Sequence, residues 1–205
     1  MRWPFDPLDP FRYGLVMCDP PWQFQLRSER GEEKAPQAHY RCMTLADVKA
    51  LPVGDLAHPD GCVLWLWATH PMLREAFAVM DAWGFRFVTS GVWTKRNPAT
   101  GKLGFGTGYA LRSASEPFLL GAIGSPSYAR NVRTVIEAAR REHSRKPDEA
   151  YAAARQLAID ATRRADLFSR ERREGWECWG DEVEKFSTEL DKHSGQFSKS
   201  ANALN

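Results

Sequence analysis

Four consecutive residues near the amino end combine a carboxylate, two prolines and a large aromatic ring. Asp19-Pro20-Pro21-Trp22 follows an apolar run at residues 14–18, and this run predicts a buried strand that ends at the carboxylate. Two consecutive prolines prevent the chain from entering a helix normally. The tetrapeptide therefore predicts a rigid corner that holds the Asp19 carboxylate, the Pro20 carbonyl and the Trp22 ring together.

Such a corner suits the activation of an exocyclic aromatic amine, which is a poor nucleophile because its lone pair is conjugated with the ring. The Asp19 carboxylate and the Pro20 carbonyl could accept both amine hydrogens and direct the nitrogen lone pair at an electrophile. Trp22 could stack on the base that carries the amine. That base must leave a duplex or come from a single strand. The alternative is that the tetrapeptide is only a turn at the end of a strand.

Residue spacing argues against a nucleotide triphosphatase site and against a zinc site. A carboxylate after an apolar strand also occurs in nucleotide triphosphatases, but these need G-x-x-x-x-G-K-S/T. Here Gly101-Lys102 is followed by Leu103, and Arg96 stands where the first glycine should be. The four cysteines form no C-x-x-C pair and have no histidine at ligand spacing. We therefore expect no metal site.

The elements that must position these residues alternate along the chain. Further strands are predicted at residues 62–68, 85–93, 118–123, 131–136, 165–169 and 176–180. Helices are predicted at residues 45–51, 71–83 and 147–157, with Thr44 and Thr69 as amino-terminal caps of the first two, Pro71 as the first helical residue of the second, and Gly84 after it. This alternation predicts an α/β fold with a mainly parallel sheet flanked by helices, whose ligands bind at the carboxyl ends of strands.

Length and composition bound the class of protein. The 205 residues are 43% hydrophobic and 26% charged, which excludes a disordered, collagen-like or coiled-coil chain. The longest apolar run, residues 62–68, is too short to cross a bilayer, and the amino end does not resemble a signal peptide. We expect a cytoplasmic protein with no membrane partner. Residues 1–186 are predicted to form a single domain with an irregular arm at 1–13, and residues 187–205 a mobile tail.

The chain resembles the MT-A70 family of adenine methyltransferases from about Tyr13 to Glu182. The family carries D-P-P-W at the end of an apolar strand. Further stretches resemble its motifs in order, at residues 39–44, 63–67, 93–95, 115–121, 144–149, 167–170 and 176–182. The resemblance implies a Rossmann-like class I methyltransferase fold with permuted motif order, in which the catalytic motif precedes the cofactor strand. It also implies methylation of the 6-amino group of adenine, with S-adenosyl-L-methionine as cofactor.

The resemblance also implies a set of cofactor-binding residues. Lys146 would pair with the cofactor carboxylate, helped by the amino end of the helix that follows it. Asp181 and Glu182 would accept hydrogen bonds from the ribose hydroxyls, although the eukaryotic members have amides there. The other residues placed near the cofactor are Cys18, Asp19, Phe168, Arg170 and Gly180, of which Phe168 is expected to pack mainly in the core. Residues 5–8 are a candidate for the cofactor's adenine.

The expected substrate is a polynucleotide, and its target base would be gripped by Trp22 and Tyr40. Tyr40 could instead anchor its loop to the core. Although the net charge is only +2, basic residues gather in three segments, at 27–41, 95–112 and 130–146, which predict a phosphate-binding rim. Within the middle segment, the rim residues expected to contact substrate are Lys95, Arg96 and Arg112.

Family analogy favours DNA, because the compact chain resembles the bacterial and phage branch. RNA methylation is the alternative within the same class. A non-catalytic nucleic-acid-binding subunit is the alternative of another class, although the intact Asp19-Pro20-Pro21-Trp22 argues against it. We expect a monomer or a homodimer.

Overall fold

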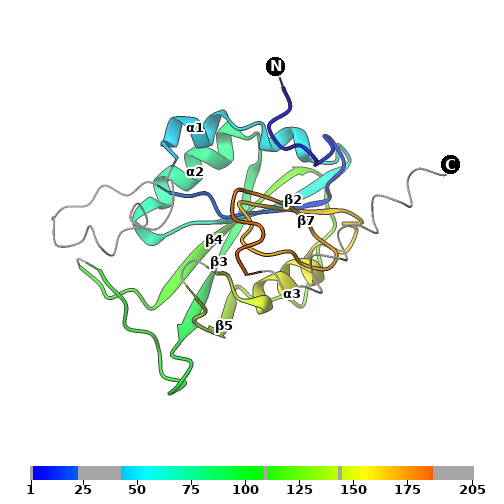
Figure 1. Cartoon of the computed structure of the whole chain (residues 1–205). Coiled ribbons are helices and arrows are strands. Elements are labelled where there is room, and N and C mark those ends of the chain that lie inside the picture. The colour runs from blue at the N-terminus through cyan, green and yellow to red at the C-terminus, as the bar shows by residue number, and fades with distance from the viewer. Residues whose placement is uncertain (1, 23–42, 109, 143–144, 187–205) are drawn as a thin grey trace.

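The structure is a computed structural model that describes residues 2–22, 43–108, 110–142 and 145–186. The strands are β1 (Leu15–Cys18), β2 (Gly61–Trp67), β3 (Arg86–Arg96), β4 (Ser115–Gly124), β5 (Val135–Ala139), β6 (Arg164–Leu167) and β7 (Glu177–Trp179). They form one seven-stranded sheet in the order β5-β3-β4-β2-β1-β6-β7 (Figure 1). Tyr40, the basic segment at 27–41 and the predicted tail lie outside the described residues.

The direction of the strands decides which residues can meet. β1 runs parallel to β2 and β6, β6 to β7, and β3 to β5, whereas β4 is antiparallel to both β2 and β3. The carboxyl ends of all the other strands therefore share one edge of the sheet with the amino end of β4. We call this the carboxyl edge, and the opposite one the amino edge.

In the described part of the chain, three α-helices cover the sheet, α1 (Leu45–Ala50), α2 (Leu73–Ala82) and α3 (Asp148–Leu157), with 3-10 turns at Val53–Leu56 and His70–Met72. Figure 1 shows α1 and α2 on one side of the sheet and α3 on the other. The mainly parallel sheet flanked by helices is thus confirmed. β1, which ends just before Asp19, precedes β6 in sequence and lies beside it in the sheet, as the permuted arrangement requires.

The central strand β2 shows why the sequence forms a sheet covered on both faces. Leu64 and Leu66 pack in the core beneath α1 and α2, while Trp65 and Trp67 pack in the core beneath α3. Successive side chains of a strand point to opposite faces, so an unbroken apolar run fills both cores. Trp65 also stacks on Phe118 of β4 at 3.9 Å between ring centroids. The two tryptophans therefore serve the core.

The helix starts were predicted with mixed success. Thr44 caps α1 as predicted, because its hydroxyl accepts a hydrogen bond from the Asp47 amide at 3.1 Å. Thr69 makes no side-chain capping bond, and a 3-10 turn containing Pro71 stands before α2. The predicted start of that helix at Pro71 was therefore wrong by two residues, because α2 begins at Leu73. β5 also begins later than predicted, at Val135, because its pairing with β3 begins there, opposite Val92.

The amino-terminal segment packs on the sheet although it forms no strand. Phe5 and Leu8 are fully or almost fully buried in the core beneath α1 and α2, and the Phe5 ring meets Trp179 edge-on at 5.1 Å between centroids. These two side chains are thus occupied with packing. Among the described residues, no helix is both long and apolar enough to span a bilayer.

Candidate active site

Four charged side chains meet at the carboxyl edge, and we call them the active-site cluster. Lys146 Nζ lies 2.7 Å from Asp19 Oδ2 and 2.8 Å from Glu116 Oε1. Lys95 Nζ lies 2.6 Å from Glu116 Oε2. The cluster therefore forms a chain of alternating charges that runs from the end of β1 to the end of β3.

The sheet topology alone brings these residues together. Asp19 follows β1, Lys95 lies near the end of β3, and Lys146 lies in the connection from β5 to α3. Glu116 comes from the beginning of β4, which reaches the same edge because β4 runs in the opposite direction. In the ladder between β3 and β4, Glu116 lies opposite Trp93. An antiparallel strand thus delivers an early residue to the edge where parallel strands deliver their last ones.

Burial and neighbouring charges shift the pKa values of Lys146 and Glu116 in the cluster. The Lys146 side chain is only 6% exposed. Burial alone would lower the pKa of Lys146, but the charges of Asp19 and Glu116 outweigh it, and the pKa is raised. Burial alone would raise the pKa of Glu116, but Lys146 and Lys95 lower it to about 2. Both groups are therefore charged at neutral pH.

The pKa of Asp19 is shifted in the opposite direction from that of Glu116. Burial raises the pKa of Asp19, and the neighbouring Glu116 charge adds to this, although Lys146 opposes both. Its Oδ2 atom is engaged by Lys146, and a carboxylate offers a second oxygen to another donor. Asp19 is thus a carboxylate held in place by one cation and suited to accept a hydrogen bond from a ligand.

Hydrogen bonds fix the corner that follows Asp19. The Asp19 amide donates to the Leu167 carbonyl at 3.3 Å, and the Trp22 amide donates to the Pro20 carbonyl at 2.8 Å. A carbonyl oxygen has two lone pairs, so Pro20 retains one for a second donor. The Met43 amide donates to the Pro21 carbonyl at 3.1 Å. The corner is therefore held at several points along its backbone.

From the sequence, the Trp22 ring is expected to be open for stacking on a base, but in the structure the ring is largely buried. The residue is 5% exposed and belongs to the core beneath α1 and α2. Its indole Nε1 donates to the Trp67 carbonyl at 3.2 Å, at the end of β2. Trp22 therefore links the corner to the central strand, and only a small part of its surface is open to a ligand.

Two further acids at this edge were given no role in the sequence analysis. Glu116 is one, and Asp166 of β6 is the other. Asp166 is buried and accepts a hydrogen bond from the Tyr151 hydroxyl of α3 at 3.0 Å. Burial raises the pKa of Asp166 to about 7, against the lowering effects of Ser169 and Tyr151. The Asp19 charge contributes to the rise, so the two carboxylates are electrostatically connected.

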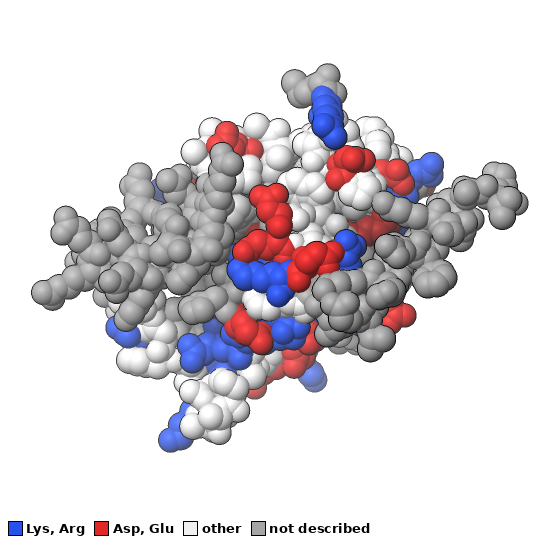
Figure 2. Space-filling model, in the orientation of Figure 1, with Lys and Arg blue, Asp and Glu red and all other residues white. Residues whose placement is uncertain are grey.

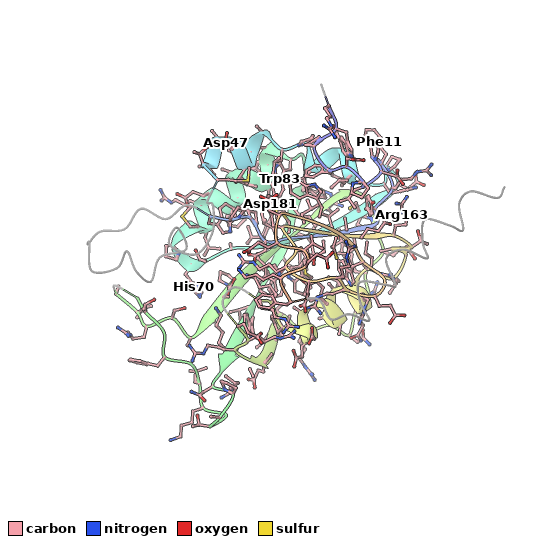
Figure 3. The ribbon with its side chains drawn as sticks, viewed as in Figure 1. Phe11, Asp47, His70, Trp83, Arg163 and Asp181 are labelled. Carbon is pink, nitrogen blue, oxygen red and sulfur yellow. The ribbon has the colours of Figure 1, made fainter. Side chains whose placement is uncertain are left out.

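Apart from Lys146, the residues expected around the cofactor lie at the end of β1 or in the segments that follow β6 and β7. Arg170 Nε lies 3.5 Å from Glu182 Oε2, and Lys185 also pairs with Glu182 at 2.6 Å. Gly180 follows β7 at a φ of +151°, where an added Cβ would lie 3.0 Å from Phe168 Cα. The Phe168 ring packs edge-on against Trp179. Cys18 is completely buried, and Asp181 is exposed near the middle of the molecule in Figure 3.

The donors and acceptors at the carboxyl edge fit S-adenosylmethionine, which carries a sulfonium, an ammonium, a carboxylate and ribose hydroxyls. Asp19 can face positive charge, and the carboxylate of Glu182 can accept from hydroxyls. A lysine ammonium has three donors, of which Asp19 and Glu116 take two of those on Lys146. The third can serve the cofactor carboxylate. Among the described residues, no three metal-ligating side chains are grouped so that they could hold a metal ion.

The basic residues expected to contact substrate do not act as one group. Lys95 belongs to the active-site cluster. Arg96 pairs with Glu137 at 3.1 Å, and Arg112 lies over the Phe105 ring, 4.8 Å from its centroid. Arg141 and Arg145 also form ion pairs, with Asp148, Glu142 and Glu171. Figure 2 accordingly shows acidic and basic side chains intermingled on this face rather than a continuous basic rim.

A separate cavity of about 310 Å³ lies at the amino edge. Its lining includes Gly14 before β1, Gly61 at the start of β2 and Ser125 just after β4. These residues are at the opposite ends of the strands from Asp19 and Glu116. The cavity therefore has no part in the arrangement described above.

Comparison with known proteins shows which family this chain belongs to. The MT-A70 family model matches residues 13–182. A putative N(6)-adenosine-methyltransferase MT-A70-like protein of Medicago truncatula is 30% identical over 176 residues, covering 84% of this chain and 26% of the plant protein. The human N(6)-adenosine-methyltransferase catalytic subunit METTL3 is 28% identical over 162 residues, covering 78% of this chain and 26% of METTL3.

A relative of similar length is the type II methyltransferase M.MunI of Mycoplasma sp. It is 28% identical over 191 residues, covering 84% of this chain and 78% of M.MunI. The chain thus spans about a quarter of the length of the plant and human relatives but most of the length of M.MunI. The match to the family model includes all seven strands and every residue of the active-site cluster.

Proposed function

Because this chain belongs to the MT-A70 family, we propose that it methylates the 6-amino group of adenine in a polynucleotide, with DNA as the favoured substrate. The observation that carries the proposal is the position of Asp19 at the carboxyl edge. Lys146 holds its carboxylate from one side, and a rigid corner places the Pro20 carbonyl directly after it. This is the pair of acceptors that activation of an exocyclic amine requires.

The chemistry of Asp19 and Pro20 would be the capture of two hydrogens. Asp19 would accept one amine hydrogen and Pro20 the other, which would turn the nitrogen lone pair out of conjugation with the adenine ring. When bound, S-adenosylmethionine would supply an activated methyl group that this nitrogen can take directly, without a covalent enzyme intermediate. The nitrogen gains a bond and must lose one proton, which Asp19 would receive. Lys146 would hold Asp19 in the ionised form that accepts.

The cofactor would be held by groups on both sides of Asp19. Lys146 is suited to the cofactor carboxylate, next to the amino end of α3. Asp181 and Glu182 are suited to the ribose hydroxyls, and Arg170 would orient Glu182 through their ion pair. Cys18, Phe168 and Gly180 would form the backbone and apolar floor beneath them. Trp22, Tyr40, Lys95, Arg96 and Arg112 remain our candidates for contacts with substrate.

DNA is favoured over RNA because the chain matches most of the length of M.MunI, whereas it matches only a fraction of the N(6)-adenosine-methyltransferases. This preference rests on size and similarity. The names of the plant and human relatives keep RNA as the second candidate. In either case we propose a cytoplasmic monomer or homodimer that acts without a metal ion.

The decisive experiment is methyl transfer from radiolabelled S-adenosylmethionine to single-stranded DNA, duplex DNA and RNA, each with and without adenine. We expect label only in polymers that contain adenine, and most in DNA. Equal labelling of an adenine-free polymer would overturn the base assignment, and preferential labelling of RNA would overturn the preference for DNA.

The variant Asp19→Ala tests the catalytic role of the carboxylate. We expect loss of transfer by a factor of at least about 100, because an acceptor aimed at the reacting group is removed. Circular dichroism should show the same fold as the wild type. Full transfer by this variant would refute the role of Asp19. Calorimetric titration with S-adenosylmethionine separates the alternative of a non-catalytic subunit, for which we expect no binding.

A further inference from the structure

The segment that follows β6 contains a buried acid, Glu171, whose side chain is 10% exposed and pairs with arginines. Arg145 donates hydrogen bonds to its Oε2 atom, and Arg173 donates to its Oε1 atom. Arg141 Nη1 lies 3.9 Å from the same Oε1 atom. Glu171 therefore lies at the centre of three guanidinium groups, and we call these four residues the Glu171 cluster.

Stability alone does not explain why this cluster is withdrawn from water. The Arg173 side chain is 14% exposed and the Arg145 side chain 18%. Removing charged groups from water costs free energy that a buried ion pair often fails to return, and apolar residues of similar volume are often as stable. The cluster is therefore better explained by the residues that it holds in place than by the energy of its own pairs.

One link of the cluster leads to the residue directly before Lys146. Arg145 donates to the same Glu171 oxygen through Nε, at 3.0 Å, and through Nη2. Two donors of one planar guanidinium fix the orientation of the side chain as well as its position. Because Arg145 and Lys146 are neighbours in the chain, Glu171 fixes the backbone from which the Lys146 side chain extends.

A second link leads to the residues directly after Lys146. Arg173 donates with one nitrogen to Glu171 and with another to Asp148, the first residue of α3. The guanidinium carbon of Arg173 also lies 3.7 Å from the centroid of the Tyr151 ring, in the first turn of the same helix. The start of α3 is therefore attached to the segment that contains Glu171.

The position of Lys146 matters because its three donors have separate partners. Its Nζ atom lies 2.7 Å from Asp19 Oδ2 and 2.8 Å from Glu116 Oε1, and the third donor is suited to the cofactor carboxylate. A lysine side chain has a flexible four-carbon stem, so it does not fix the direction of its own donors. Attachment of the backbone on both sides of Lys146 supplies the constraint that the side chain lacks.

From these contacts we propose that Glu171 is a positioning residue, which acts through Arg145 and Arg173 to direct the third donor of Lys146 at the cofactor carboxylate. This inference rests on the proposed function and adds the residue that sets the geometry of Lys146. Loss of the Glu171 carboxylate should weaken the grip on the carboxylate end of the cofactor.

The ribose end of the cofactor site should be spared by the same change. The Ser169 hydroxyl donates to the Glu171 carbonyl at 2.7 Å, so the backbone of this segment is held independently of the Glu171 side chain. The pair between Arg170 and Glu182 does not involve the Glu171 side chain either. A selective effect on one end of the cofactor therefore distinguishes positioning of Lys146 from general support of the fold.

The test compares two ligands by calorimetric titration of the full chain. S-adenosylhomocysteine carries the carboxylate, whereas 5′-methylthioadenosine has the same adenine, ribose and sulfur but neither carboxylate nor ammonium. Glu171→Gln should weaken binding of S-adenosylhomocysteine about tenfold, because a displaced ammonium loses much of a hydrogen bond between charged groups. Binding of 5′-methylthioadenosine should be unchanged, which also shows that the variant is folded.

Glu142→Gln is the matched control. Glu142 also pairs with Arg145, at 3.2 Å, but its side chain is 58% exposed. A solvated pair constrains geometry weakly, so this variant should bind both ligands as the wild type does. Arg145→Gln is a second test that removes the link to Lys146 while Glu171 keeps Arg173, and it should show the same selective loss even if Glu171→Gln does not fold.

The positioning role and the proposed function can fail separately. Equal weakening of both ligands, or of neither, in Glu171→Gln and Arg145→Gln would overturn the role of Glu171. A wild-type chain that binds neither ligand would refute the proposed function and this inference with it. Selective loss of S-adenosylhomocysteine binding, with no methyl transfer to any adenine-containing polymer, would refute the proposed reaction and leave the positioning role standing.

Discussion

Two charged clusters join distant parts of the sequence at opposite edges of the same sheet. At the carboxyl edge, the active-site cluster joins Asp19 to Lys146 across 127 positions. At the amino edge, Arg163 pairs with Asp9 at 2.8 Å and with Glu177 at 2.7 Å. We call Asp9, Tyr13, Arg163 and Glu177 the latch. Figure 3 shows Arg163 beside the amino-terminal segment that carries Phe11.

The clusters differ in their access to water. Arg163 is 33% exposed and Asp9 61%, whereas Lys146 is 6% exposed. A solvated ion pair contributes little stability and costs little to form. A buried pair costs several kcal/mol of desolvation per ion, and an apolar pair of similar volume is often as stable. The latch can therefore be explained by its attachment of the amino-terminal segment to the sheet. The burial of charge in the active-site cluster is explained by function rather than by stability.

The largest effect should follow removal of the cation from the buried cluster. Lys146→Met leaves Asp19 and Glu116 buried together without their shared partner, and we expect a loss of about 3–5 kcal/mol in the free energy of unfolding. Urea denaturation measures it. Lys95→Met is the matched control and should cost much less, because Glu116 keeps Lys146. Equal losses in the two variants would contradict the central place of Lys146.

A second large effect concerns the pH dependence of stability. The folded-state pKa of Asp166 is about 7, against 3.8 for the ordinary side chain, so the folded state binds more protons between these values. Stability due to this group should therefore fall as pH rises from about 4 to 7. In Asp166→Asn this fall should be smaller by on the order of 4 kcal/mol. Denaturation series at several pH values measure the difference, and parallel curves for variant and wild type would contradict it.

A third prediction concerns the pH dependence of transfer. Because burial and Glu116 raise the pKa of Asp19, the acid limb of kcat/KM should have its midpoint above 3.8. Glu116→Gln removes one of the raising charges, so the midpoint should move to lower pH even if the rate falls. A midpoint that moves upward would show that Glu116 acts mainly by holding Lys146.

The smallest effects should come from the latch. Arg163→Met loses its ion pairs and its position over the Tyr13 ring, and we expect a loss of about 1–2 kcal/mol with methyl transfer unchanged. Asp9→Asn, at the more exposed end, should change stability by less than about 0.5 kcal/mol. A loss of transfer in either variant at a temperature where it is folded would remove the distinction between the two edges.

The central strands and Asp19 could be predicted from sequence because their signals are local. An unbroken apolar run such as 62–68 has few other uses in a chain of this composition, and two prolines after a carboxylate fix a corner without help from the rest of the fold. Glu116 and Asp166 were missed because nothing near them in sequence marks them. Glu116 matters only when β4 reverses direction and meets Lys146, 30 positions later.

The burial of Trp22 likewise depends on a contact that is distant in sequence. Its place after the prolines suggested a ring held open for a base, and no neighbouring residue argues otherwise. Its partner, the Trp67 carbonyl, lies 45 positions away at the end of β2. Only the pairing of β1 with β2 brings the two together, so the burial of the ring could not be foreseen from the motif.

Because β4 runs antiparallel to β3, the segment between these strands could vary in length during evolution or by design. The pairs Trp93–Glu116 and Thr94–Ser115 close the base of the connection between β3 and β4 from within the ladder of these two strands. Loop length beyond such a base costs little stability, because closure entropy grows only slowly with the number of residues. Longer or shorter segments could therefore be exchanged between β3 and β4 while Lys95 and Glu116 stay in register.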